Sequence, residues 1–146
     1  MRRHLSALVV LVVSISCGYG QEKPTKDKAL EVLRPFFNAL LARDFDTAMK
    51  LVLAPGDRAE AARKELKDLI TDRHISAKGI AALARTGKWG RLDELFSKNQ
   101  VESMTLDGKI KVDSCFGLAI EGVGAGFYWD GKQLKILRCV DIGLLQ

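Results

Sequence analysis

The sequence contains few of the residues that build metal sites or covalent active sites. Of its 146 residues, 2 are histidine and 3 are cysteine. His4 lies near the N-terminus, and His74 has no second histidine or cysteine at ligand spacing, so we predict no metal site. We interpret His74, near the end of an expected helix, as a surface or capping group. No Gly-x-Ser-x-Gly turn is present and Cys115 has no evident histidine partner, which argues against nucleophilic catalysis.

A nucleotide-binding loop is also missing. The glycine-rich run at 122–126 lies between two strand-like segments, not between a strand and a helix, and no Lys-Ser or Lys-Thr follows it. We interpret this run as a hairpin or a bulge, and we expect no cofactor.

The chain has no concentrated charge of one sign. Its formal net charge is +5, and residues 1–20 contribute two arginines and no acid, so their removal would lower the charge to +3. The remaining excess is spread over helical and strand-like segments. A nucleic-acid-binding protein would concentrate its basic residues on one face, so we expect no nucleic-acid partner.

No apolar run is long enough to span a membrane, but one has the length of a signal-peptide core. Leu5–Val13 follows Arg2 and Arg3 and precedes small residues from Ser14 to Gly20, whereas a spanning helix needs ~20 apolar residues. We therefore predict a signal peptide at 1–20, cleaved after Gly18 or Gly20, and a periplasmic or extracellular protein.

A second way of processing the N-terminus stays open. Ser14-Ile15-Ser16-Cys17 resembles a bacterial lipobox, which implies lipid attachment at Cys17. In that case the protein would be held at a membrane surface. Without the lipid, we expect no membrane partner.

After a short polar tether at 21–28, the chain is expected to form a single domain at 29–146. Apolar residues at helical spacing predict a helix over 26–42, in which Pro35 predicts a kink or a delayed start. Asp44 can cap a second helix that ends before Pro55-Gly56, and Asp57 with Glu60 resembles the capping pair of a third. Weaker helical signals cover 76–85 and 91–97.

From Val101 onward the apolar period changes from helical to strand-like. Alternation over 109–121 predicts one long strand with an apolar even-numbered face. Asp107-Gly108 and Asp130-Gly131 are typical hairpin dipeptides. The second would place Trp129 opposite Lys132 and Phe127 opposite Leu134. The even-numbered apolar positions are Ile110, Val112, Phe116, Leu118, Ile120, Leu134, Ile136, Val140 and Ile142.

These patterns predict an α+β fold in which N-terminal amphipathic helices pack on one face of a C-terminal antiparallel meander sheet. An oxidising compartment would favour a disulfide between Cys115 and Cys139, worth about 3.5 kcal/mol in the chain-entropy model. A simple meander, however, places them on strands separated by a third strand. Both cysteine states stay open.

Two segments resemble the nuclear transport factor 2-like, or SnoaL-like, superfamily. Residues 36–48 (FFNALLARDFDTA) are similar to its first two helices, and residues 128–136 (YWDGKQLKI) to its last hairpin. The resemblance implies a cone-like fold, here a possible truncated form, with a pocket between a curved sheet and the helices. Some members of that superfamily are isomerases, dehydratases or cyclases, and others bind ligands.

Arg138 is the residue that breaks the apolar pattern, because it shares the even-numbered face with Ile136 and Val140. It could hold an anionic ligand group in a pocket, or it could reach solvent or pair with a helix carboxylate. Trp89, Phe127 and Trp129 are candidate pocket walls. The strand carboxylates Asp113 and Asp141 fall on the opposite face, unless a one-residue bulge reverses the register.

Three functions are compatible with this sequence. The first is a non-catalytic domain that binds a small apolar or anionic ligand or a protein partner. The second is an isomerase- or dehydratase-type enzyme that uses a pocket carboxylate. The third is an interaction protein that forms a homodimer through the polar sheet face, where Cys115, Gly117 and Ala119 would permit close approach.

Overall fold

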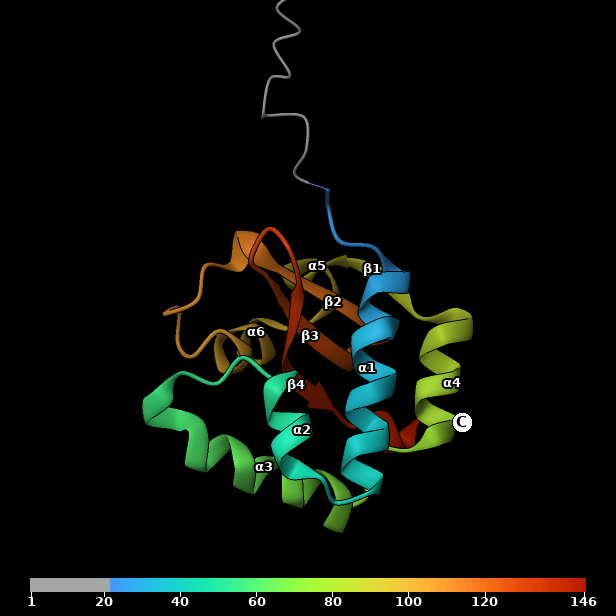
Figure 1. Ribbon diagram of the computed structural model, residues 1–146. Helices are drawn as coiled ribbons and strands as arrows, with labels where there is room; N and C mark the ends of the chain where they lie inside the picture. The colour runs from blue at the N-terminus through green and yellow to red at the C-terminus, as the bar shows by residue number, and fades with distance from the viewer. Residues whose placement is uncertain (1–21) are drawn as a thin grey trace, which may run out of the picture.

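The computed structural model describes residues 22–146, so the predicted signal peptide, including Cys17, lies outside the described residues. Within 22–146, no helix is both long enough and apolar enough to cross a membrane. The chain forms an α+β fold (Figure 1). In chain order its elements are α1 (Lys26–Leu41), α2 (Phe45–Lys50), the 3-10 turn η2 (Gly56–Arg58), α3 (Ala59–Thr71), α4 (Ala77–Thr86), β1 (Lys88–Arg91), α5 (Leu92–Leu95), α6 (Lys98–Met104), η3 (Val112–Ser114), β2 (Cys115–Ile120), β3 (Val123–Trp129), β4 (Leu134–Val140) and η4 (Ile142–Leu144).

The sheet is a four-stranded antiparallel meander with the order β1-β2-β3-β4. This confirms the predicted fold class. The sequence analysis did not predict β1, which lies between the two weak helical signals and takes in Arg91, the first residue of the second one. β1 pairs with β2 as an edge strand, and Trp89 stacks on Phe116 of its neighbour.

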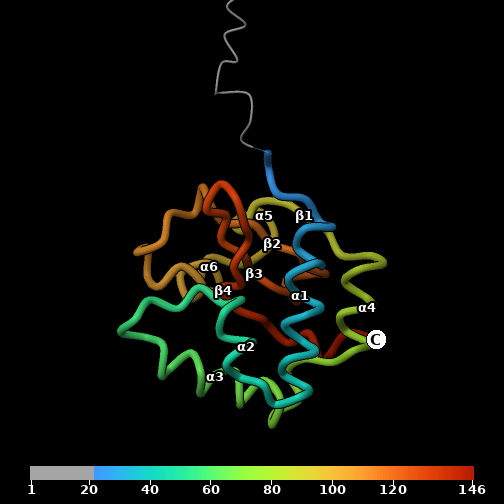
Figure 2. The backbone as a smooth tube through the Cα atoms, viewed as in Figure 1, coloured from blue at the N-terminus to red at the C-terminus, as the bar shows by residue number. Residues whose placement is uncertain are grey.

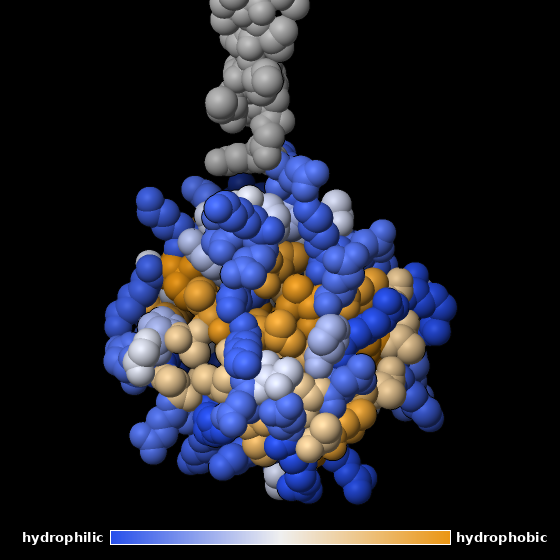
Figure 3. All heavy atoms as spheres, in the orientation of Figure 1, coloured by the Kyte–Doolittle hydropathy of each residue, from blue (hydrophilic) through white to orange (hydrophobic). Residues whose placement is uncertain are grey.

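The main core lies between the sheet and the helices α1 to α4 (Figure 2). As predicted, Leu118 and Ile136 are buried there, together with α1 residues such as Leu33 and Leu40. On the face of the molecule seen in Figure 3, charged side chains cover much of the outside, and apolar side chains gather near the centre.

The opposite face of the sheet is covered as well. Leu92 and Phe96, in and just after α5, and Met104 of α6 form a second apolar cluster with Cys115 and Ala119 of β2. A Cβ atom at Gly117 would lie 2.8 Å from a ring carbon of Phe96, so the missing side chain lets this aromatic ring pack on the strand. The predicted polar face is therefore internal, and a homodimer cannot form through Cys115, Gly117 and Ala119 in this fold.

Side-chain caps set several of the helix starts. Thr25, Asp44 and Ser76 each accept a backbone hydrogen bond at the start of α1, α2 and α4. Pro35 lies inside α1 on its exposed side and does not delay the helix start. The predicted cap at Asp57 is wrong, because a 3-10 turn precedes α3 and Arg58 at its N-cap makes no side-chain cap bond.

The strand predicted over 109–121 is too long. β2 begins at Cys115, after the 3-10 turn η3, and the region from Val101 is still helical because α6 runs to Met104. Asp107-Gly108 belongs to a turn after α6, not to a hairpin. Ser97 and Gln100 form a capping box at the start of α6. This Ser-x-x-Gln signal was available in the sequence and marks the start of α6, whereas the alternation over 109–121 formed a strand only from Cys115 onward.

Both β-hairpins of the meander have identifiable turn chemistry. Glu121 and Gly122 have positive φ angles of 50° and 76°, so the glycine-rich run does begin a hairpin. The next loop contains Asp130–Gln133 and pairs Trp129 with Leu134, not with Lys132 as predicted. The Oδ1 atom of Asp130 accepts from the backbone N–H groups of Lys132 and Gln133, each at 2.8 Å, which stabilises the longer loop.

A β-bulge interrupts the pairing of β3 with β4. Phe127 pairs with Ile136 but Gly126 pairs with Arg138, so Leu137 is an extra residue in β4. Side chains after it change face: Cys139 joins the main core, and Val140 packs against the second cluster. The prediction that Arg138 faces the helical core is therefore wrong. It lies on the α6 side of the sheet.

A substitution at Gly79 can test the close contact between α4 and η4. A glycine-to-alanine change inside a helix normally stabilises by about 1 kcal/mol. A Cβ at Gly79 would lie 1.9 Å from the carbonyl oxygen of Ile142, so we expect Gly79→Ala to destabilise by about 1–3 kcal/mol in urea unfolding. Gly56→Ala is the control, because a Cβ there meets nothing within 4 Å. A stabilising effect of Gly79→Ala would contradict this packing.

Candidate functional site

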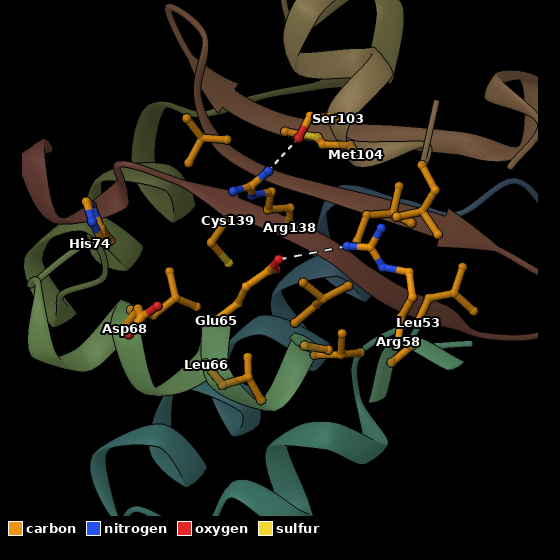
Figure 4. Close-up of a pocket in the computed structure, with 18 of the residues that line it drawn as sticks. Leu53, Arg58, Glu65, Leu66, Asp68, His74, Ser103, Met104, Arg138 and Cys139 are labelled. Atoms are coloured by element: carbon orange, nitrogen blue, oxygen red, sulfur yellow. Dashed lines mark hydrogen bonds and ion pairs between the residues drawn. The ribbon is translucent and has the colours of Figure 1, made fainter. Parts of the chain in front are cut away.

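A cleft of about 570 Å³ lies between α3, the outer edge of β4 and α6 (Figure 4). This volume is within the range of small-ligand sites, about 300–1,000 Å³. Its apolar lining comes from all three walls and from α1: Phe36, Leu53, Leu66, Leu69, Met104 and Ile136.

The cleft exists because β4 is an edge strand whose outer side is only partly covered. Val52 forms a parallel bridge with Ile136, where Leu53 N–H donates to the Ile136 carbonyl at 2.9 Å and Ile136 N–H donates to the Leu51 carbonyl at 2.8 Å. Pro55 follows directly, and the chain turns away from the strand into α3. One side of α3 then faces β4 across the cleft, through Ala62, Leu66, Leu69 and their neighbours.

A smaller hollow of about 350 Å³ continues the cleft along α6. It shares Arg58, Ser103 and Arg138 with the larger one and adds Glu102 and Asp107. The two hollows form one continuous site, which we call the β4 cleft.

Arg138 is the predicted site residue that the structure does place in the β4 cleft. The bulge at Leu137 turns it toward α6, where a guanidinium nitrogen donates to the Ser103 hydroxyl. Figure 4 shows its side chain directed from β4 toward Ser103 and Met104 of α6. Among residues 22–146, no carboxylate lies within 4.0 Å of its guanidinium group. The alternative of a pairing with a helix carboxylate is therefore absent, whereas the alternative that Arg138 reaches solvent is confirmed, because the residue is exposed and its hydrogen-bond partner is neutral.

Arg58 is a second cation in the cleft, which the sequence analysis missed. It lies 4.0 Å from Glu65, and both side chains are about half exposed. Exposed ion pairs of this kind contribute about 0–1 kcal/mol, so an incoming anion could replace Glu65 at little cost.

The other end of the β4 cleft is acidic. Asp68, Asp72 and Asp141 line it together with His74, whose Nδ1 lies 3.2 Å from Asp141 and whose Nε2 lies 3.8 Å from Asp72. His74 is a surface residue, as interpreted from the sequence. In residues 22–146 no three histidine, cysteine or acidic side chains are grouped closely enough to hold a metal ion.

The predicted aromatic walls lie elsewhere. Trp89 stacks on Phe116 with ring centroids 5.6 Å apart, lies 5.8 Å from Phe127, and donates from Nε1 to the Pro24 carbonyl at 3.1 Å. Lys28 lies over the Trp129 ring at 5.3 Å. These rings hold the N-terminal end of the domain against the sheet and do not line the β4 cleft, because their strand positions face α1.

The two carboxylates considered as a general base, Asp113 and Asp141, lie in different parts of the fold. Asp113 lies in η3, is exposed, and pairs with Arg91 at 3.3 Å, far from the role of a buried base. Asp141 lines the cleft, because the bulge changed the register of the residues after it. It adopts a left-handed backbone conformation, with φ 48°.

Cys115 and Cys139 are both free thiols. They lie on β2 and β4, with β3 between them, and two strand spacings amount to about 9–10 Å, beyond the ~7 Å limit on the Cα separation of a disulfide. They also belong to different apolar clusters. Burial raises the pKa of Cys115 to about 11 and that of Cys139 to about 12. The disulfide alternative is not realised in this structure.

No protein-family model, curated protein or solved structure matches the chain. The function must therefore be argued from the β4 cleft, and the resemblance to the nuclear transport factor 2-like superfamily stays a prediction.

The cysteine state can be measured with a thiol reagent on the protein without residues 1–20. At pH 8 a thiol with a pKa of about 11 is about one part in a thousand thiolate, so native Cys115 and Cys139 should react slowly. After unfolding without a reductant, both should react rapidly. Detection of no free thiol in the unfolded chain would instead show a disulfide.

Proposed function

We propose that this chain is an exported, non-catalytic binding domain whose β4 cleft takes an amphipathic ligand with one anionic group. The observation that carries the proposal is Arg138, a cation beside an apolar cleft that is oriented by a serine hydroxyl and has no carboxylate partner among the described residues. A carboxylate on the ligand is the simplest group that would supply the missing ion-pair partner of Arg138.

The geometry of a guanidinium group favours this ligand. Arginine presents parallel N–H donors that match the two oxygens of a carboxylate, and such charge-assisted pairs are the stronger hydrogen bonds in proteins. The Ser103 contact restricts the Arg138 side chain, which lowers the entropic cost of binding. Arg58 supplies a second positive charge at the same end.

The walls of the cleft favour an apolar body on that ligand. Leu66, Met104 and Ile136 are almost fully buried and form part of the lining. Each methylene group transferred from water into such a site contributes about 0.8 kcal/mol. A ligand with several methylene groups and one carboxylate would use both features.

Binding is favoured over an isomerase or dehydratase reaction by the exposure of the acids. A pocket carboxylate acting as a general base in such enzymes is normally shielded from water. The side chains of Glu65, Asp72 and Asp141 in the cleft are about 50% exposed, and Asp68, Glu102 and Asp107 are also exposed.

Export is supported by the N-terminal sequence pattern and is compatible with the position of the cleft. The described chain enters the domain beside the start of α1, at the end opposite to α3 (Figure 1). Processing before Glu22 is therefore not expected to obstruct the ligand site.

The role of Arg138 can be tested with decanoate as a probe in isothermal titration calorimetry. We expect decanoate to bind and Arg138→Gln to weaken binding by about fivefold, because Arg138 is exposed and an exposed ion pair contributes up to about 1 kcal/mol. Arg34→Gln is the control, since Arg34 is exposed on α1 and lies outside the cleft. Equal affinities for the two variants, or no binding of decanoate at millimolar concentration, would contradict the proposal.

The N-terminal prediction can be tested by intact mass measurement of protein made in a bacterial host. Signal-peptide cleavage should give a chain that starts at Tyr19 or Gln21. Lipidation should give a chain that starts at Cys17 and carries added acyl mass, and Cys17→Ser should abolish that species. An unprocessed chain that starts at Met1 would exclude both routes.

A further inference from the structure

We propose that the ligand of the β4 cleft is the C-terminal end of an extended peptide, which adds as an antiparallel strand to the edge of β4. The peptide carboxylate would pair with Arg138, and a basic side chain three residues earlier would meet the acidic end of the cleft. This inference rests on the proposed function and specifies its ligand class.

The shape of the cleft supports an extended ligand. Along β4 the lining residues run consecutively from Ile136 to Val140, a distance of about 13 Å at ~3.3 Å per residue, and Asp141 follows. Along α3 they run from Arg58 to Asp72, a distance of about 21 Å at ~1.5 Å per residue. A compact molecule would fill only part of this length, whereas an extended peptide of about five residues would follow all of it.

The outer edge of β4 is available for pairing beyond Ile136. Within residues 22–146, Ile136 is the β4 residue whose backbone bonds to a segment outside the sheet, through Leu51 and Leu53. Pro55 and the bulge at Leu137 then end this contact, and no strand covers the edge from Arg138 onward. An uncovered edge beside a hollow is the surface that β-strand addition uses.

The charges of the cleft select the direction of the added strand. β4 runs from Arg138 toward Asp141, so its earlier part lies at the end that holds Arg58 and Arg138, with Glu65, Glu102 and Asp107 beside them. Its later part lies toward Asp68 and His74 (Figure 4). A parallel peptide would bring its carboxyl terminus to the acids. An antiparallel peptide brings the carboxylate to Arg138 and the earlier residues to Asp68 and Asp141, and among the lining residues both arginines lie at the Arg138 end, so this direction gives the carboxylate a cationic partner.

The side chains of the peptide follow from the same register. With the last residue opposite Arg138, the residue two positions earlier is opposite Val140, where β4 ends, and the residue three positions earlier lies beside Asp141, about 10 Å from Arg138 along the chain direction. An apolar last side chain would lie near Leu66 and Ile136, which line the cleft. A lysine or arginine at the earlier position would meet Asp72 and Asp141.

Fluorescence anisotropy of a labelled peptide tests the carboxylate and the backbone pairing. The probe is fluorescein-Gly-Ala-Lys-Ala-Val-Leu with a free carboxyl end, measured against the full-length mature protein. We expect about tenfold weaker binding for the C-terminal amide. Arg138→Gln should remove this difference between acid and amide, whereas Arg34→Gln should preserve it. N-methylation of the peptide backbone removes an N–H donor that strand pairing needs. It should weaken binding at least as much as amidation of the C-terminus does.

A double-mutant cycle tests the direction of the peptide. Replacing the peptide lysine by norleucine should weaken binding to the natural protein but have little effect on binding to Asp141→Asn, a change that keeps a residue tolerant of positive φ. The reversed sequence, fluorescein-Leu-Val-Ala-Lys-Ala-Gly, should bind poorly. Equal binding of the N-methylated peptide, of the amide, or of the reversed sequence would overturn the inference.

The decanoate titration separates this inference from the proposed function. If decanoate binds in an Arg138-dependent way and the peptide does not bind, the cleft takes small carboxylates and the peptide proposal is wrong. If neither probe binds, both proposals are wrong. Binding of both probes, with protection of the backbone amides of Cys139 and Asp141 by the peptide in hydrogen exchange, would support both.

Discussion

The extra residue in β4 is the constraint on which the site depends. Leu137 has no partner of its own on β3, so the strand bends and the side chains that follow it change face. Gly126 makes this possible on the other strand, since a Cβ there would lie 2.5 Å from the Met104 sulfur. Met104 of α6 fills that space, and α6 in turn carries Ser103 to Arg138. Without the bulge, the Arg138 guanidinium would be directed into the apolar layer beneath α1, where an unpaired cation is costly.

A second constraint is that helices cover both faces of the sheet. The apolar clusters on the two sides cover most of β2 and β3, as the burial of Phe127, Cys115 and Ala119 shows. A ligand therefore has no access to a sheet face and can approach the strands only at an edge. At β1 the edge is short. At β4 the segment around Val52 covers one part of the edge, and the remainder opens into the cleft.

The fold could be predicted from the sequence where local chemistry and apolar period agreed. Thr25, Asp44 and Ser76 are side-chain caps in front of apolar helical repeats, and the helices begin there. The meander also followed from short strands and glycine turns. Prediction failed over 98–114, where the alternation of lysine with apolar residues resembled a strand. The capping box at Ser97 and the packing of Met104 against β2 and β3 make the first part of this region a helix.

The sequence by itself determined that apolar helices must cover an antiparallel sheet, because both patterns need a partner layer and local caps and turns set most of their ends. It also singled out Arg138 as a charged residue that interrupts the apolar pattern of its strand. Only the tertiary structure decided where that arginine lies, since a one-residue bulge has no reliable signal in a single strand and depends on what packs against the opposite glycine. The cleft was likewise decided by tertiary structure, because its three walls come from α3, α6 and β4, which are separated in the chain and meet only after folding.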